Sequence, residues 1–172
     1  MCGIIGAASS RSVGKILVNG LKKMEYRGYD SAGLVLNSES EAIQLKTLGK
    51  VAKLEDLMIE KRPRAQSGIA HTRWATHGEP SQKNAHPHAS NGTIYIVHNG
   101  IIENHDELRE RLSNDGYKIE SETDSELIAH LIYSNKENGK STLEALIEAT
   151  KELHGAYSIA VIDTEQKGKI FA

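Results

Sequence analysis

The sequence predicts one globular domain of the α+β class. Its 172 residues are enough to bury a single core. Apolar residues recur at helical spacing in several segments, whereas other segments carry the short apolar runs typical of strands. Two of these runs, 32–37 and 42–48, are separated only by a short polar turn, which is typical of neighbouring strands in an antiparallel sheet.

The first half of the chain predicts two helices and four strands. The first helix should lie between Ser12, which can cap it, and Gly28, which can end it. The second, over 51–58, should stop before Pro63, because the residue before a proline disfavours the helical conformation. The strands are expected at 4–5, 32–37, 42–48 and 68–72.

The second half begins with segment 73–90, in which apolar residues recur at neither helical nor strand spacing. A stretch of this length inside a compact domain is usually functional or disordered. A strand that is apolar on both faces follows at 93–98. A last hairpin is expected from 157–163 and 169–172. Between them, three helices each carry a cap with an acidic partner three residues on: Asn104 with Glu107, Thr123 with Glu126, and Ser141 with Glu144.

Charge and hydropathy argue against several classes of protein. The net charge of −2 and the isoelectric point near 6.4 give no basic field for nucleic acid. No apolar run approaches the roughly 20 residues that span a bilayer, and the N-terminus lacks a signal-peptide pattern. A single cysteine fits a reducing compartment. We therefore expect a soluble, cytoplasmic domain that binds neither nucleic acid nor membrane.

Cys2 is the only cysteine and follows the initiator methionine. A small second residue allows Met1 to be removed, and Cys2 would then carry a thiol and a free α-amine. Their reference pKa values, about 8.5 and about 7.7–8, place both groups near working pH. This predicts a nucleophile that carries its own base. The alternative is a buried, inert cysteine.

Three other polar stretches could carry chemistry. Segment 26–33 places polar residues among glycines, although for this stretch alone an ordinary turn between a helix and a strand is the favoured interpretation. In segment 71–80, Arg73 ends a strand and could clamp a carboxylate, or be a solvated surface side chain. An amide such as that of Asn99 and an N–H such as that of Gly100 are the donors that form an oxyanion hole. The same Asn-Gly pair is also a strong hairpin signal, and the local pattern favours the turn.

The histidines suggest a metal site as another alternative. His71, His77, His86 and His88, together with Cys2, could be considered as zinc ligands. The chain has no H-E-x-x-H or C-x-x-C spacing, however. We therefore expect neither a metal nor another cofactor.

Six motifs in order resemble one family. They are residues 1–6, 26–33, 71–80, 84–88, 98–104 and 121–126. Together they are similar to the glutamine-hydrolysing domain of the glucosamine-6-phosphate synthases (glutamine–fructose-6-phosphate transaminases), which are class II, N-terminal-nucleophile amidotransferases. The resemblance covers the whole chain as one domain, 1–172, and implies a four-layer αββα sandwich of the Ntn-hydrolase type. Amidophosphoribosyltransferases share some of these motifs, but Tyr29-Asp30 after Arg27-Gly28 favours the sugar enzymes.

The resemblance also implies a reaction. Cys2 resembles the nucleophile, with its freed α-amine as base, and Asn99 and Gly100 resemble the oxyanion donors. The products would be glutamate and ammonia. In the full-length enzymes of the family, the ammonia goes to fructose 6-phosphate to make glucosamine 6-phosphate.

The substrate-binding residues follow from the same resemblance. Arg73 is similar to the residue that grips the α-carboxylate of glutamine, and Asp124 to the one that binds its α-ammonium. Asp124 starts a predicted helix, which should hold its carboxylate at a defined place. Trp74, Thr76 and His77 lie on the loop that closes over glutamine.

Two departures from the family qualify these expectations. The family domain normally runs past residue 172 and is followed by two isomerase domains, so we expect a C-terminally truncated domain that is less stable and self-associates into a homo-oligomer through an exposed strand edge. While Met1 is attached, the nitrogen of Cys2 is an amide and cannot be a base. The chain would then be a module that only binds glutamine or glutamate. A third alternative is the glutaminase half of an amidophosphoribosyltransferase.

Overall fold

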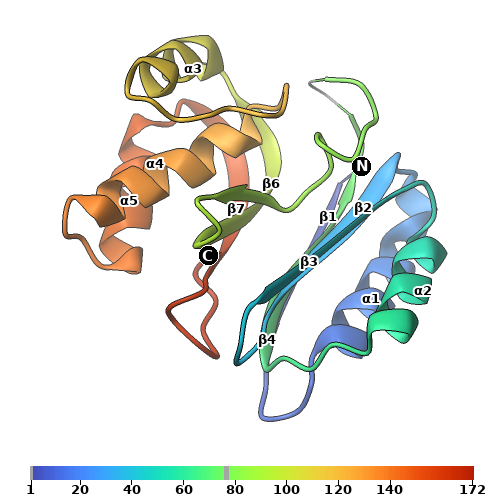
Figure 1. The fold of residues 1–172 in the computed structure, drawn as a ribbon. Coiled ribbons are helices and arrows are strands. Elements are labelled where there is room, and N and C mark those ends of the chain that lie inside the picture. The colour runs from blue at the N-terminus through green and yellow to red at the C-terminus, as the bar shows by residue number, and fades with distance from the viewer. Residues whose placement is uncertain (1, 76–77) are drawn as a thin grey trace.

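The computed structural model describes residues 2–75 and 78–172. Two β-sheets face each other in the middle of the molecule, and helices cover the outer face of each (Figure 1). This is the four-layer αββα arrangement predicted from the sequence. No helix in the described ranges is both long enough and apolar enough to cross a membrane.

The first sheet is antiparallel, in the order β1-β4-β2-β3, with α1 and α2 on its outer face (Figure 1). A short 3₁₀ turn, η1, follows α1 directly. The elements of this half are β1 Gly3–Ala8, α1 Gly14–Met24, η1 Glu25–Arg27, β2 Ser31–Asn37, β3 Ala42–Leu48, α2 Val51–Lys61 and β4 Ser67–Arg73. All the helices and strands predicted in this half are present, although the N-cap of α1 is Val13 and not Ser12.

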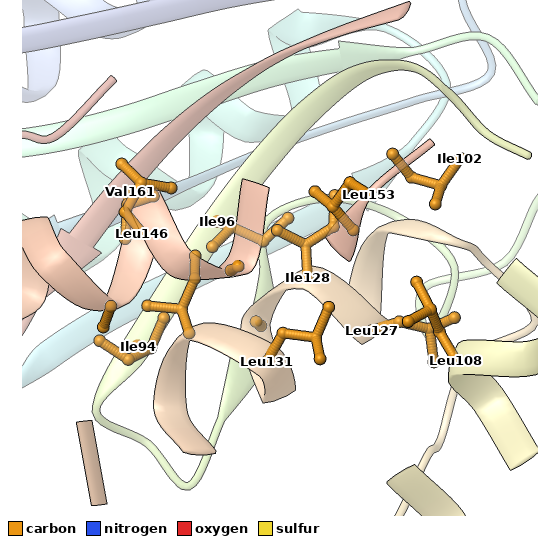
Figure 2. Packing of buried hydrophobic residues seen from close by; sticks show 14 of the residues in the cluster. Ile94, Ile96, Ile102, Leu108, Leu127, Ile128, Leu131, Leu146, Leu153 and Val161 are labelled. Atoms are coloured by element: carbon orange, nitrogen blue, oxygen red, sulfur yellow. The ribbon is translucent and has the colours of Figure 1, made fainter. Parts of the chain in front are cut away.

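The second sheet is antiparallel, in the order β5-β6-β7. Helices α4 and α5 cover it, and their apolar side chains fill a core against β6 and β7 (Figure 2). The elements are β5 His88–Ser90, β6 Ile94–Ile102, α3 His105–Asn114, α4 Ser125–Glu137, α5 Thr142–Glu152 and β7 Gly155–Asp163. The predicted final hairpin is only partly correct, because beyond β7 a single bridge, Val161 to Phe171, replaces the expected strand.

Alternation along β6 sorts its side chains between two cores. Ile96 and Ile102 pack in the core beneath α4 (Figure 2). Tyr95 and Val97 pack in the core between the two sheets. Side chains two residues apart on a strand share a face. Asn99 therefore points toward the space between the sheets.

The same rule applies to β1 and β4. Ile4 and Ile69 join the core between the sheets, whereas Ile5 and Ala70 join the core beneath α1. By the same period of two, His71 and Arg73 on β4 and Cys2 just before β1 belong to the space between the sheets. Strand alternation thus turns the side chains of three sequence motifs toward one region.

A buried polar contact also joins the two sheets far from Cys2. Asn37, at the last position of β2, donates its side-chain N–H to the backbone carbonyl of Asp163 at 3.1 Å. Ser31 at the start of β2 pairs with Arg73, so Asn37 marks the opposite end of the strand.

The three predicted helix caps have different outcomes. Ser141 and Glu144 form the complete capping box at the start of α5. At the start of α4 the N-cap residue is Asp124 and not the predicted Thr123. Thr123 Oγ1 still accepts the N–H of Glu126 at 3.4 Å, which is half of the predicted box. The Glu126 carboxylate instead accepts backbone N–H groups from the preceding turn.

The third prediction, at Asn104, is correct only for the position of the helix start. The Asn104 side chain makes no cap bond to α3. It instead donates to the carbonyl of Glu152 and accepts from the N–H of His154, at 2.9 and 3.0 Å. Asn104 therefore ties the start of α3 to the connection between α5 and β7.

Buried histidines should make the fold sensitive to acid. Burial lowers the pKa of His71 to about 4 and the pKa values of His86 and His88 well below their usual range. Below pH 6.5 the unfolded chain then binds more protons than the folded one, so stability should fall as pH drops from about 6.5 toward 4. A histidine whose pKa falls from about 6.5 in the unfolded chain to about 4 in the folded protein, as for His71, lowers the free energy of unfolding by about 2 kcal/mol between pH 7 and pH 5.

The measurement is the melting temperature of the protein and of His86→Asn at pH 7 and pH 5. The asparagine keeps an acceptor for the N–H of His98, which His86 Nδ1 accepts at 3.2 Å. The substitution should therefore reduce the acid-induced loss of stability, while His154→Gln, at an exposed histidine, should not. An equal pH dependence for all three proteins would contradict the prediction.

Candidate active site

Cys2 lies immediately before β1 and is only partly buried, unlike the buried cysteine of the alternative interpretation. Its Sγ accepts the backbone N–H of Trp74 at 3.1 Å and lies 3.6 Å from the carbonyl oxygen of the same residue. These contacts hold the sulfur beside the start of the aperiodic segment that follows β4.

Strand pairing explains why Trp74 meets Cys2. Gly3 lies opposite Thr72 in the antiparallel β1–β4 pair, so the chain leaving β4 passes the residue before Gly3. Asp30 then fixes the direction of the chain. Its N–H donates to the carbonyl of Arg73 at 2.7 Å, and its carboxylate accepts the N–H of Ala75 at 2.5 Å.

The Trp74 ring packs against Gly28. Gly28 has φ +74°, and a Cβ built there would lie 2.7 Å from Cζ3 of Trp74. Only glycine suits both the conformation and the contact. The stretch 26–33 is therefore more than a turn, because it supports the segment that carries Trp74.

Arg73 is 4% exposed, so the interpretation as a solvated surface arginine is wrong. Its guanidinium donates to the carbonyls of Gly78 and Glu79 at 3.1 and 3.4 Å, and lies 3.6 Å from the Asp30 carboxylate. Arg73 thus provides a fixed positive charge next to the residue that contacts Cys2.

Asn99 and Gly100 lie within β6, opposite Ser158 and Tyr157 of β7, so the hairpin-turn interpretation is wrong. Asn99 Nδ2 donates to the carbonyl oxygen of Cys2 at 3.4 Å, and its Oδ1 lies 2.7 Å from His71 Nε2. Gly100 has φ +131°, and a Cβ there would lie 2.2 Å from the carbonyl oxygen of Ala156. Any side chain at Gly100 would displace β7.

Asp124 is the N-cap residue of α4 and is 4% exposed. Its carboxylate accepts the N–H of Ile102 at 2.9 Å and the hydroxyl of Ser125 at 3.2 Å. His98 Nδ1 lies 4.0 Å from the same carboxylate. The bond from Ile102 holds the buried Asp124 carboxylate at the end of β6, the strand that carries Asn99 and Gly100.

Direct hydrogen bonds therefore bring three predicted residues together: Cys2, Trp74 and Asn99. Arg73 precedes Trp74 in the chain, and Gly100 follows Asn99. A cleft of about 440 Å³ has Cys2 and Asn99 on its wall, between β1 and β7. The predicted residues Thr76 and His77, like Met1, lie outside the described residues.

The metal alternative has no support in the described part of the chain. There, no group of three or more His, Cys, Asp or Glu side chains is arranged to hold a metal ion. Two of the histidines considered as ligands instead stack ring on ring: the centroids of His71 and His86 are 4.1 Å apart.

Sequence comparison identifies the family. The family described as glutamine amidotransferase domain matches residues 71–172. The chain belongs to this family. It is 52% identical over its full length to the glutamine–fructose-6-phosphate aminotransferase (isomerizing) of Haemophilus influenzae, and 51% identical over 99% of its length to that of Vibrio parahaemolyticus. The chain spans only about 28% of the length of these relatives.

Solved structures of other amidotransferases share the fold. The glutamine phosphoribosylpyrophosphate amidotransferase of B. subtilis matches 95% of this chain with a TM-score of 0.80, at 22% identity and over 35% of its own length. A glutamine aminotransferase class-II domain protein from Silicibacter pomeroyi also matches 95% of the chain, with a TM-score of 0.62, at 16% identity and over 73% of its own length. The sandwich is thus the fold of amidotransferase domains far apart in sequence.

Two residues of this amidotransferase domain were not among the predicted site residues. Asp30 directs the chain past Cys2, and His71 bonds to Asn99. Both lie within motifs that the sequence analysis singled out, 26–33 and 71–80. Their partners are 45 and 28 residues away along the chain, so local pattern could not assign them.

Gly28→Ala should disturb the Trp74 side of the site. The added Cβ would meet the indole, and alanine at positive φ costs about 1 kcal/mol in addition. Trp74 is the only tryptophan, so its fluorescence reports on this contact directly. We expect a shifted emission spectrum and a lower melting temperature.

Gly168→Ala is the matched control, because Gly168 has φ +71° and, apart from its chain neighbours, no heavy atom of the described residues lies within 4 Å of the position of its added Cβ. It should lower stability through the backbone alone and leave the tryptophan emission unchanged. Identical spectra for both variants would show that Gly28 does not support Trp74.

Proposed function

We propose that this domain hydrolyses the side-chain amide of L-glutamine to glutamate and ammonia, with Cys2 as the nucleophile after Met1 is removed. The observation that carries the proposal is the position of Cys2. Its sulfur accepts the Trp74 N–H, and Asn99 donates to its carbonyl from the opposite sheet. The proposed nucleophile and an amide donor thus lie next to each other in a glutamine amidotransferase domain.

In the proposed reaction, the free α-amine of Cys2 takes the thiol proton, and the sulfur attacks the carboxamide carbon of glutamine. The Asn99 side-chain N–H and the Gly100 backbone N–H stabilise the negative oxygen that forms. The proton then passes to the amide nitrogen, the C–N bond breaks, and ammonia leaves a thioester on Cys2. Water adds to the thioester, glutamate leaves, and the thiol is restored.

Glutamine bears an α-carboxylate and an α-ammonium. The domain has a cationic side chain, Arg73, for the first and an anionic side chain, Asp124, for the second. Arg73 would bind the carboxylate, because a guanidinium matches its geometry. Asp124 would bind the ammonium from its fixed place at the end of β6. Trp74, Thr76 and His77, which follow Arg73, would cover the bound amino acid.

The names of the relatives extend the proposal to the whole protein. A longer protein would pass the ammonia to fructose 6-phosphate and form glucosamine 6-phosphate on isomerase domains that partner this one. A nucleophilic thiol has to stay reduced, which favours the cytoplasm. That the chain forms a homo-oligomer stays a prediction. An amidophosphoribosyltransferase half has less support, since the likeness to that enzyme is at 22% identity, against 52% for the sugar aminotransferase.

The rival function is a binding-only module that retains Met1. Removal of Met1 should raise glutaminase activity, because only the free α-amine can take the thiol proton. The test compares glutamate release before and after aminopeptidase treatment, with N-terminal mass spectrometry on both samples. Cys2→Ala should release no glutamate in either sample. Equal rates with and without Met1 would exclude the α-amine as the base.

Asn99→Ala should lower kcat about 10²–10³-fold with a much smaller change in KM for glutamine. Its amide acts on an oxygen whose charge develops only after attack, so the loss falls on the chemical step. Steady-state glutamate release by the protein lacking Met1 measures both constants. A higher KM with unchanged kcat would remove Asn99 from the oxyanion role.

A further inference from the structure

We infer that His71 is a positioning residue for Asn99: its Nε2–H donates to Asn99 Oδ1 and thereby turns the Nδ2 of that amide toward Cys2. The inference rests on the proposed function, in which Nδ2 stabilises the oxyanion. His71 itself touches neither Cys2 nor the substrate in this scheme. It acts only through the orientation of Asn99.

The contact is short and buried. Nε2 and Oδ1 are 2.7 Å apart, and His71 is 1% exposed. It also crosses between the two sheets, since His71 belongs to β4 and Asn99 to β6. His71 lies opposite Ile4 in the β1–β4 pair, two residues from Cys2. The bond therefore ties the amide donor to the sheet that carries the nucleophile.

The chemistry of the pair fixes the tautomer. A carbonyl oxygen can only accept, so Nε2 must carry the hydrogen, and Nδ1 of the neutral ring then has none. His71 Nδ1 is buried and has no hydrogen-bond partner among the described residues, which suits an unprotonated nitrogen better than a donor. Burial also lowers the pKa of His71 to about 4, so the ring is neutral near pH 7.

The His71 ring is further held by its neighbour. It stacks on His86 with an interplanar angle of 23° and a centroid distance of 4.1 Å. A rotation of the His71 ring would lose this face-to-face contact as well as the bond to Asn99. The stack thus keeps Nε2 directed at the amide.

Asn99 needs this fixed partner because the two ends of an amide have nearly the same shape. Rotated by 180°, Asn99 would present an acceptor oxygen to the developing oxyanion and repel it. The contact on the Nδ2 side, to the carbonyl of Cys2, is long at 3.4 Å. The 2.7 Å bond from His71 is therefore the stronger determinant of which end faces the site.

The test uses two substitutions at His71 in the protein lacking Met1. His71→Leu removes the donor, whereas His71→Gln places a side-chain NH₂ near the position of Nε2. We expect His71→Leu to lower kcat at least about 10-fold with KM nearly unchanged, and His71→Gln to recover most of the loss. Asn99→Ala, alone and combined with His71→Leu, completes a double-mutant cycle. His71→Leu should cost nothing further once the Asn99 amide is gone.

His130→Leu is the matched control for losing a buried histidine. His130, on α4, is 5% exposed and bonds to Ser90 of β5, which pairs with Ile94 at the opposite end of β6 from Asn99. His130→Leu should lower the melting temperature. Any factor by which it lowers kcat should be the same in the Asn99→Ala protein as in the protein with Asn99. Melting curves and Trp74 emission establish that each variant is folded.

Different results test the positioning role of His71 and the oxyanion role of Asn99. If Asn99→Ala lowers kcat but His71→Leu lowers it by the same factor in both backgrounds, His71 does not act through Asn99 and the inference is overturned. The same holds if His71→Gln is as slow as His71→Leu, or if only KM changes. If Asn99→Ala leaves kcat unchanged, the oxyanion assignment in the proposed function fails, and the inference falls with it.

Discussion

The site depends on the pairing of β4 with β1 on one side and β2 on the other. This double pairing fixes the register of His71 and Arg73 relative to both neighbouring strands. A slip of one residue would turn both side chains toward α1 and bring Ala70 and Thr72 to face the other sheet. It would also move Trp74 away from the sulfur of Cys2. The apolar residues on either face of β4 are what make such a slip costly.

The sequence predicted the elements well, because most of them depend on local patterns. Periodicity located the helices and strands, and the Ser141–Glu144 box formed as expected. Two predictions failed because the residues concerned have partners far along the chain. Asn104 bonds to the α5–β7 connection, and Asn99-Gly100 continues a strand because β7 pairs along its length. A short window of sequence contains no information about partners so far along the chain.

The candidate site was predictable to the extent that its residues lie in recognisable motifs. Cys2 and Asn99 were named in advance, and the structure places them in contact. Asp30 and His71 were not predicted to belong to the amidotransferase site, although both lie in motifs that carry the resemblance. Each acts on another residue of the site, and such a role follows only from three-dimensional contacts. The arginine was named, but its burial was not expected, because an isolated arginine in a sequence is usually exposed.

The bond between Asn37 and Asp163 has a consequence for the geometry of the whole sandwich. Apolar packing between two sheets is non-directional, so by itself it resists separation better than rotation. Two directional hydrogen bonds, Asn37 to Asp163 and His71 to Asn99, join the sheets at opposite ends of the sandwich. A single bond would let one sheet rotate about it relative to the other, whereas two bonds at separate places oppose that rotation. The angle between the sheets, and with it the alignment of groups contributed by each sheet, is therefore set partly at the end of β2 that lies far from Cys2.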